Sequence, residues 1–148
     1  MINASTNGVV SSTYDLVNMH DIQEARTIVG QYARKTPLMQ SMFLSRNVTG
    51  GDVFLTLENT QLTGSFKFRG ANNKINHLTD AEKARGVIAA SAGNHAQGVA
   101  LTGKLLGIET TVVMPEEAPQ MKRDATAGYG ANVDIHGATF DDSYAWMA

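Results

Sequence analysis

The stretch VIAASAGNHAQGVALTGKLLGIETTVVM, residues 87–114, decides the fold class. It begins with four apolar residues and ends with five β-branched or apolar residues, and both runs have the length of a strand. Between them, residues 94–106 have the composition of a helix, and Gly107 follows where a left-handed residue commonly ends one. Two strands joined by a helix form a parallel pair with a right-handed crossover, so we expect a βαβ unit here.

The same alternation of strands and helices extends to both sides of this unit. We predict strands at residues 53–57 and 132–136, helices at residues 65–76 and 119–126, a capping box at residues 79–82 and a last helix from residue 140 onward. The sequence therefore predicts an α/β fold, in which a parallel sheet carries helices on both faces. Ligands of such sheets bind beyond the carboxyl ends of the strands, so the loops there are the candidates for a site.

The N-terminal part differs in composition from the rest. Residues 1–20 begin with a polar stretch, and we expect a disordered tail there. Residues 21–50 are expected to form a helix and a linker: Asp21 is the expected N-cap of a helix over residues 22–33, and the Thr36-Pro37 step ends it. Residues 51–148 would then form the α/β domain.

Composition excludes several classes of protein. The 148 residues carry a formal net charge of -2 and no cysteine, so disulfides and thiolate chemistry are excluded. No basic stripe indicates nucleic-acid binding, no apolar run indicates a membrane partner, and the start of the chain has no signal-peptide pattern. The four histidines form no pair at the i, i+4 spacing, so no metal site is expected. We expect a cytoplasmic protein.

The loop ENTQLTGSFKFRGA, residues 58–71, contains the first candidate for chemistry. Lys67 falls in the first turn of the predicted helix, where the positive end of the helix dipole disfavours the charged form of an amine. A free lysine amine is the nucleophile of Schiff-base chemistry, so Lys67 is a candidate catalytic residue. The alternative is an ordinary solvated lysine next to Arg69.

The loop SAGNHAQG, residues 91–98, contains the second candidate. Ala92 and Gly93 are small enough for a ligand to approach the backbone, and the free amides at the start of the next helix form an anion site. Asn94 offers both a donor and an acceptor. The alternative is a plain helix cap by Ser91 or Asn94. We expect both loops at the same end of neighbouring strands of the sheet.

The two loops together resemble the signatures of the serine/threonine dehydratase family, within the tryptophan-synthase-β-like (fold type II) enzymes that use pyridoxal 5'-phosphate (PLP). The resemblance runs from about residue 21 to residue 148 and includes the Thr36-Pro37-Leu38 step. It implies that Lys67 binds PLP covalently and later removes the substrate α-proton. It also implies a cofactor contact for Phe66 and a hydrogen bond from Asn94 to the 3′-oxygen of the ring. The substrate carboxylate would be held by Ser91, Gly93, Asn94 and His95.

The same resemblance implies a function. The reaction would be dehydration and deamination of L-threonine, and of L-serine in some members, to 2-oxobutanoate or pyruvate and ammonia, in isoleucine biosynthesis or in threonine catabolism. Serine racemases that resemble this family carry a serine where this chain has Ala92, which favours dehydration over racemisation. Relatives form homo-oligomers, and some bind a nucleotide effector, for which Thr63 and Gln97 are the candidates.

Length is the main departure from the family pattern. Family members continue into a second α/β half, which carries a glycine-rich loop for the PLP phosphate. The resemblance therefore implies that residues 51–148 form a truncated small PLP domain. Residues 21–50 would pack on the missing large domain, and the chain would be inactive alone. The alternative is a non-catalytic remnant, or one half of a split protein, that binds a partner or an anion.

Overall fold

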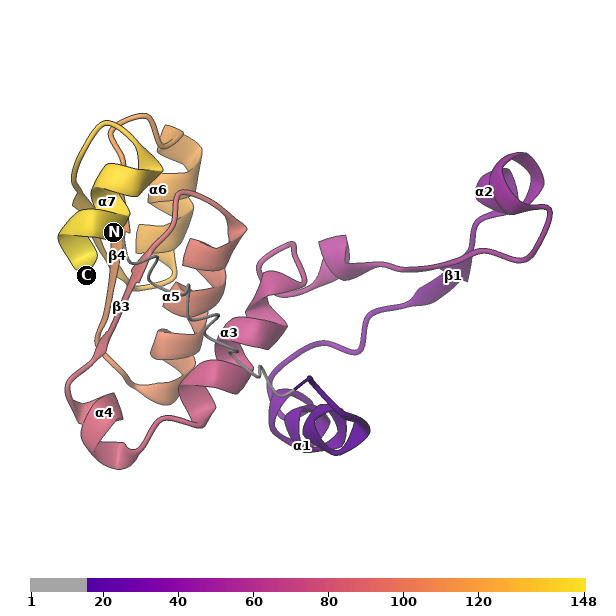
Figure 1. Cartoon of the computed structure of the whole chain (residues 1–148), viewed down its shortest axis with the longest axis horizontal. Coiled ribbons are helices and arrows are strands. Elements are labelled where there is room, and N and C mark those ends of the chain that lie inside the picture. Colours follow the sequence, from indigo (N-terminus) through magenta and orange to yellow (C-terminus); the bar gives the residue numbers. More distant parts are fainter. Residues whose placement is uncertain (1–15) are drawn as a thin grey trace, which may run out of the picture.

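A three-stranded parallel sheet forms the centre of the main body, in a computed structural model that describes residues 16–148 (Figure 1). The strands are β3 (Val87–Ala90), β4 (Thr110–Met114) and β5 (Asn132–Ile135), in the order β3-β4-β5. The register pairs Val87 with Thr110 and Val112 with Val133. The predicted βαβ unit and the strand after it are thus confirmed. No other strand among the described residues pairs with the outer edge of β3.

Helices cover both faces of this sheet, as predicted. The helices α5 (Asn94–Leu106) and α6 (Gln120–Gly128) pack on one face, and α7 (Phe140–Met147) contacts β3 and β4 from the other (Figure 1). The alternation of side chains along β4 explains this, because a strand directs successive residues to opposite faces. Val112 and Met114 are buried in one cluster with residues of α5, while the neighbouring Val113, also buried, belongs to the opposite face. Gly107 ends α5 in a left-handed conformation, with φ at 67°.

A second sheet, of two antiparallel strands, lies outside this body. It consists of β1 (Leu38–Gln40) and β2 (Phe54–Thr56), with Leu38 opposite Thr56. The strands extend into an arm whose tip contains α2 (Met42–Leu44) and a π-helical turn, Ser45–Thr49 (Figure 1). The prediction of a strand at residues 53–57 was right in place but wrong in partner. A strand of three residues carries too little apolar pattern to specify the sheet to which it belongs.

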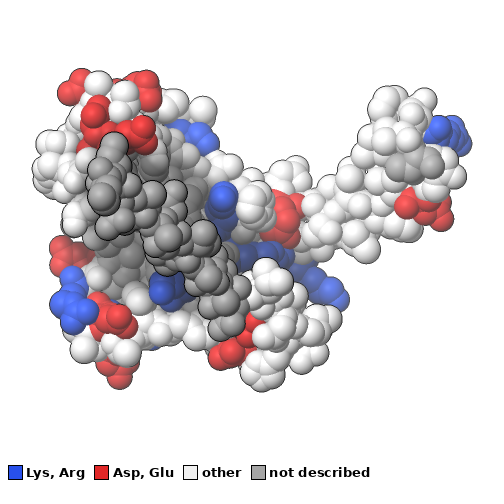
Figure 2. Space-filling view, in the orientation of Figure 1, with Lys and Arg blue, Asp and Glu red and all other residues white. Residues whose placement is uncertain are grey.

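The arm exposes apolar side chains. Its surface is largely uncharged in Figure 2, and its exposed residues include Leu38, Met39, Met42, Phe43, Val48 and Phe54. Phe43 alone is 72% exposed. An exposed apolar surface of this kind is typical of a face that another protein segment covers.

The first helix, α1 (Met19–Val29), begins earlier than predicted. Its N-cap is Asn18, whose Oδ1 accepts hydrogen bonds from the amides of His20 and Asp21 at 2.8 and 3.3 Å. Asp21 is therefore not the N-cap, because its carboxylate accepts the Asn18 amide and completes a capping box. The helix ends at Val29 rather than at residue 33, and it packs against α3. Of the tail predicted at residues 1–20, residues 1–15 lie outside the described residues, and the last two belong to α1.

Two helices connect the arm to the central sheet. The first, α3 (Lys67–Asn76), packs closely on α5, and the short α4 (Asp80–Ala84) starts at the predicted capping box of Thr79 and Glu82. Phe68, Ala71 and Ile75 of α3 are buried, and the last two share an apolar cluster with Val99 of α5. This contact, and not a shared sheet, is what fixes α3 against the body. No helix within residues 16–148 is long and apolar enough to cross a membrane.

Candidate active site

The backbone of Lys67 rests directly on α5 at Gly98. A β-carbon built on Gly98 would lie 3.2 Å from the carbonyl carbon and oxygen of Lys67 and 3.2 Å from the α-carbon of Phe68. Any other residue at this position would require the neighbouring backbone to shift by a few tenths of an ångström. Since Gly98 lies one helical turn after Asn94, the contact brings the start of α3 next to the first turn of α5. The two candidate loops meet in this way. Contrary to our expectation, the strand before the first loop does not belong to the parallel sheet.

The segment that precedes Lys67 is held by its own polar residues. Glu58 forms an ion pair with Arg69 across the segment, with an oxygen–nitrogen distance of 2.7 Å, and it also accepts a hydrogen bond from the hydroxyl of Thr36 at 2.6 Å. The hydrogen bond from Arg69 lowers the pKa of Glu58 below its ordinary value. The side chain of buried Gln61 bonds both the amide and the carbonyl of Arg34, each at 2.9 Å. These bonds tie the start of α3 to the chain before the arm.

The amine of Lys67 is accessible and unpaired with any carboxylate within residues 16–148. Its Nζ lies 5.1 Å from the centre of the Phe66 ring, which is itself exposed. Burial lowers the pKa of His95, and the charge of Lys67 lowers it further. His95 and Lys67 are thus close enough to interact electrostatically. An accessible amine beside an aromatic ring and a neutral imidazole is a suitable set for carbonyl chemistry.

Ser91 organises the second loop from a buried position. Its Oγ accepts hydrogen bonds from the amides of Gly93 and Ala96, at 3.3 and 3.2 Å. Neither Ser91 nor Asn94 is the N-cap of α5, which is Gly93, but the Ser91 hydroxyl does accept an amide of the first turn. Helix geometry leaves the amides of Asn94 and His95, the first two residues of α5, without an intrahelical acceptor. A β-carbon added at Gly93 would meet open space, so the backbone is accessible there.

The side chain of Asn94 has a partner that the sequence analysis missed. Nζ of Lys122, on α6, donates a hydrogen bond to Oδ1 of Asn94 at 2.7 Å. Lys122 is 28 residues further along the chain, and the packing of α6 on α5 brings it to the site. Nothing in the local sequence around Lys122 distinguishes it from the neighbouring Arg123. Only a three-dimensional arrangement could have revealed it.

The two residues proposed for an effector are both at least partly buried. Thr63 is buried, and its hydroxyl has no hydrogen-bond partner among residues 16–148, while Gln97 is half-buried. Tyr129, at the end of α6, donates a hydrogen bond to the carbonyl of Leu62 at 3.3 Å and connects this segment to the body. The nucleotide site at Thr63 and Gln97 stays a prediction.

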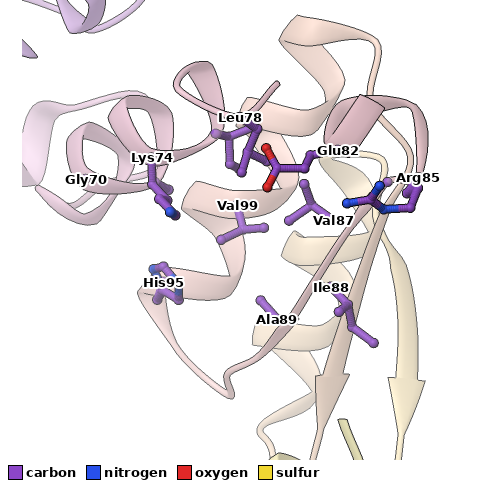
Figure 3. Close-up of a pocket in the computed structure, with 13 residues that line it drawn as sticks. Gly70, Lys74, Leu78, Glu82, Arg85, Val87, Ile88, Ala89, His95 and Val99 are labelled. Atoms are coloured by element: carbon purple, nitrogen blue, oxygen red, sulfur yellow. The ribbon is translucent and has the colours of Figure 1, made fainter. Parts of the chain in front are cut away.

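A groove of about 390 Å³ extends from His95 along α3, α4 and β3 (Figure 3). In Figure 3, His95 and Lys74 lie at one end of the groove, and Ile88 and Arg85 at the other. Its lining is mainly apolar, with Leu78, Val87 and Val99 among the residues that form it. The groove thus adjoins the candidate site at His95 and extends along the outer edge of the sheet.

Comparison with known proteins identifies the family. A family model described as pyridoxal-phosphate dependent enzyme matches residues 29–148. The chain belongs to this family. It is 59% identical over 143 residues to a catabolic L-threonine dehydratase of Staphylococcus aureus strain USA300, a match that covers 97% of this chain and 41% of the relative. The chain therefore spans about two fifths of the length of the curated relatives it matches.

Solved structures of PLP-dependent enzymes share the fold. Maize serine racemase superposes with a TM-score of 0.83 at 34% identity, over 88% of this chain and 40% of that one. The processed form of threonine deaminase isoform 2 from Solanum lycopersicum superposes with a TM-score of 0.75 at 37% identity, over 86% of this chain and 36% of that one. These relatives confirm the resemblance to the serine/threonine dehydratases and the expected fold class.

The residues around Lys67 fit part of the PLP molecule. The amine suits the aldehyde of PLP, the Phe66 ring suits the apolar face of its ring, and the Asn94 amide suits the ring oxygen. The buried hydroxyl groups of Thr63 and Ser65, on the segment before Lys67, have no partner within the described residues, so each can form a hydrogen bond with an added group. The glycine-containing segment 128–130 does not have the form of a phosphate loop, because it precedes β5 and does not open a helix.

Proposed function

We propose that this chain is the lysine-bearing part of a PLP-dependent L-threonine ammonia-lyase, which converts L-threonine, and L-serine, to 2-oxobutanoate or pyruvate and ammonia. The observation that carries the proposal is the contact of Gly98 with the backbone of Lys67, which sets the amine beside the first turn of α5. The identity of 59% to a protein named as a catabolic L-threonine dehydratase supports threonine as the substrate and a catabolic role.

Each residue of the site has a task that suits its chemistry. The Nζ of Lys67 would hold the cofactor through its aldehyde carbon and, once the substrate amine has displaced it, would take the α-proton of the substrate as a free amine. Bound PLP supplies an electron sink for the electron pair that this proton leaves behind. Phe66 would pack on the cofactor ring, and the side-chain amide of Asn94 would donate a hydrogen bond to the 3′-oxygen of that ring. The β-hydroxyl of the substrate would take up a proton and leave as water, and hydrolysis of the resulting enamine would give 2-oxobutanoate and ammonia.

The substrate carboxylate binds at the start of α5 in this proposal. The amides of Asn94 and His95 lack an acceptor within their own helix, and the positive end of the helix dipole favours an anion there. The Oγ of Ser91 uses its lone pairs for the amides of Gly93 and Ala96, so its own hydrogen remains for the carboxylate. A lowered pKa keeps the His95 ring neutral at neutral pH, and a neutral ring donates one hydrogen bond without adding charge.

A serine racemase is the second candidate, because the maize enzyme of that name superposes with a TM-score of 0.83. Racemisation needs a proton donor on the face of the substrate opposite to the lysine. Ala92 has no hydroxyl, and it packs against the apolar cluster of α5 and β4. This observation favours elimination. An assay of L-serine that separates pyruvate from D-serine distinguishes the two activities.

The remaining parts of the enzyme follow from the length of the relatives. The phosphate donors would lie in the part of those relatives that this chain does not span. The region of residues 21–50 would pack on that part, and the exposed apolar side chains of the arm support such a covering. A homo-oligomer and an effector site at Thr63 and Gln97 belong to the same proposal. A non-catalytic protein that binds a partner or an anion is the alternative.

An absorbance spectrum of the purified chain with added PLP tests the proposal. The spectrum of lysine-bound PLP should appear in the wild-type chain, be lost in Lys67→Ala and persist in Lys74→Ala. Lys74 is a matched control, because it is an exposed lysine of the same helix. If wild type and Lys67→Ala both give only the spectrum of free PLP, this chain forms no working cofactor site alone, and it is either an inactive fragment of the enzyme or a non-catalytic remnant. Formation of 2-oxobutanoate from L-threonine is the second measurement.

A further inference from the structure

We infer that Lys122 is a positioning residue, which fixes the orientation of the Asn94 side-chain amide in the site. The inference rests on the proposed function, in which that amide faces the ring oxygen of PLP. The geometry is a single contact between two helices: Nζ of Lys122 on α6 lies 2.7 Å from Oδ1 of Asn94 on α5. Within residues 16–148, Asn94 is the one side-chain partner of Lys122.

The chemistry of the two groups explains why the contact sets an orientation. A side-chain amide presents an acceptor at Oδ1 and two donors at Nδ2, and rotation by half a turn exchanges them. An ammonium group is a donor only, so it accepts just one of these two orientations. With Oδ1 on Lys122, both hydrogens of Nδ2 are directed elsewhere. A ring oxygen that carries negative charge needs such donors, and it would repel the amide oxygen of the reversed orientation.

The backbone of Lys122 is fixed well enough for this role. Its amide donates to the carbonyl of Pro119 at 2.8 Å, and its carbonyl accepts the hydroxyl of fully buried Thr126 at 2.8 Å. The adjacent Arg123 donates to the carbonyls of Ala118 and Glu116 instead. The two neighbouring cations therefore have different partners: Arg123 bonds the loop before α6, and Lys122 bonds Asn94 in the site.

The contact predicts a measurable change without any cofactor. In a nitrogen-15 spectrum of the chain, the Asn94 side-chain signal is identified by its loss in Asn94→Ala. This signal should shift in Lys122→Met, shift less in Lys122→Arg, which keeps a donor, and stay in place in Lys104→Met. Lys104 is an exposed lysine on α5 and serves as the matched control. An Asn94 signal that is the same in wild type and Lys122→Met overturns the inference.

A second experiment tests the consequence for the cofactor. The affinity for PLP, read from the absorbance of lysine-bound PLP, should fall by about threefold to tenfold in Lys122→Met. Because Lys122 acts through Asn94, the double variant with Asn94→Ala should bind no more weakly than Asn94→Ala alone. Additive losses would overturn the positioning role. A wild-type chain that forms no lysine-bound PLP shows instead that this chain alone has no working cofactor site, and the nitrogen-15 spectrum still decides the contact.

Discussion

Gly98 and Lys67 touch through their backbones, and a β-carbon on Gly98 would come within 3.2 Å of the Lys67 carbonyl. The candidate catalytic lysine can take this position because Gly98, on helix α5, has no side chain. Small residues beside Gly98, such as Ala96 and Ala100, are fully or almost fully buried and allow α5 to pack between α3 and the sheet. The position of the amine therefore depends on the distance between α3 and α5.

Gly98→Ala should move α3 away from α5 and lower stability. A contact at 3.2 Å to backbone atoms leaves little room for relaxation, so we expect a loss of about 1–3 kcal/mol in the free energy of unfolding. PLP binding should weaken as well, because the start of α3 carries Lys67. Urea denaturation and PLP titration measure the two effects.

Gly70→Ala is the control for this prediction. Gly70 lies inside α3, and a β-carbon there would meet no atom of the described residues within 4 Å. Alanine is the better helix former by about 0.5–1 kcal/mol, so this variant should be as stable as wild type or more stable. If both variants lose stability equally, the close packing at Gly98 is not the cause.

Glu58→Gln should reveal a pH-dependent part of the stability. The hydrogen bond from Arg69 lowers the pKa of Glu58 below its ordinary value of 4.5. Its contribution is therefore fully present above pH 4.5 and is lost as the pH falls through the lower pKa of the folded state. The pair is partly exposed, so we expect wild type to exceed the variant by about 1 kcal/mol at neutral pH.

Thermal unfolding of both chains between pH 7 and pH 3 checks this expectation. The difference between wild type and Glu58→Gln should shrink as the pH falls below 4.5. A difference that stays constant over this range would mean that the variant acts through packing. Glu82→Gln serves as a comparison, because the pKa of Glu82 is also lowered, but by hydrogen bonds from Thr79 at the start of α4 and not by Arg69.

Lys67→Met should raise the pKa of His95 without restoring its ordinary value. Burial is the larger cause that lowers this pKa, and the charge of Lys67 is the smaller one. Removing the charge should therefore leave the pKa below 6.5 but above that of wild type. Titration of the His95 ring by NMR measures both values, with Lys104→Met as the control.

The sign of the His95 shift also fixes its effect on stability. A pKa that is lower in the folded state means that the unfolded chain binds more protons below pH 6.5, so His95 makes the fold less stable as the pH falls through that value. His95→Gln should reduce this loss between pH 7 and pH 5. If the variant has the same pH dependence as wild type, burial of His95 is not responsible for it.

The central sheet was predictable because its signals agree with one another. From residue 87 onward, apolar runs of strand length alternate with helices, and Gly107 ends α5 as expected. The arm was not predictable, since β1 and β2 have three residues each and find their partners across 13 intervening residues, 41–53. The same alternation that predicts a strand at residues 53–57 says nothing about which strand lies beside it.

The candidate site was predictable where its residues lie in one motif. Lys67 and the loop at Ser91 carry their own chemical signals, and the packing of α3 on α5 brings them together. Lys122 was missed because its contact with the site is made to a residue 28 positions away in the sequence. The N-cap of α1 was missed for a smaller reason: Asn18 and Asp21 are both good caps, and the two exchange hydrogen bonds with each other's backbone.

The outer edge of β3 has a consequence for the behaviour of the chain in concentrated solution. The amides of Val87 and Ser91 bond toward β4, so the alternate residues Ile88 and Ala90 direct their backbone groups outward, where no described strand receives them. Ile88 is also 50% exposed. A row of unpaired backbone groups beside an apolar side chain is a template for adding strands from other molecules. The colloidal stability of the chain therefore depends on whether this edge is covered, independently of how firmly the core is folded.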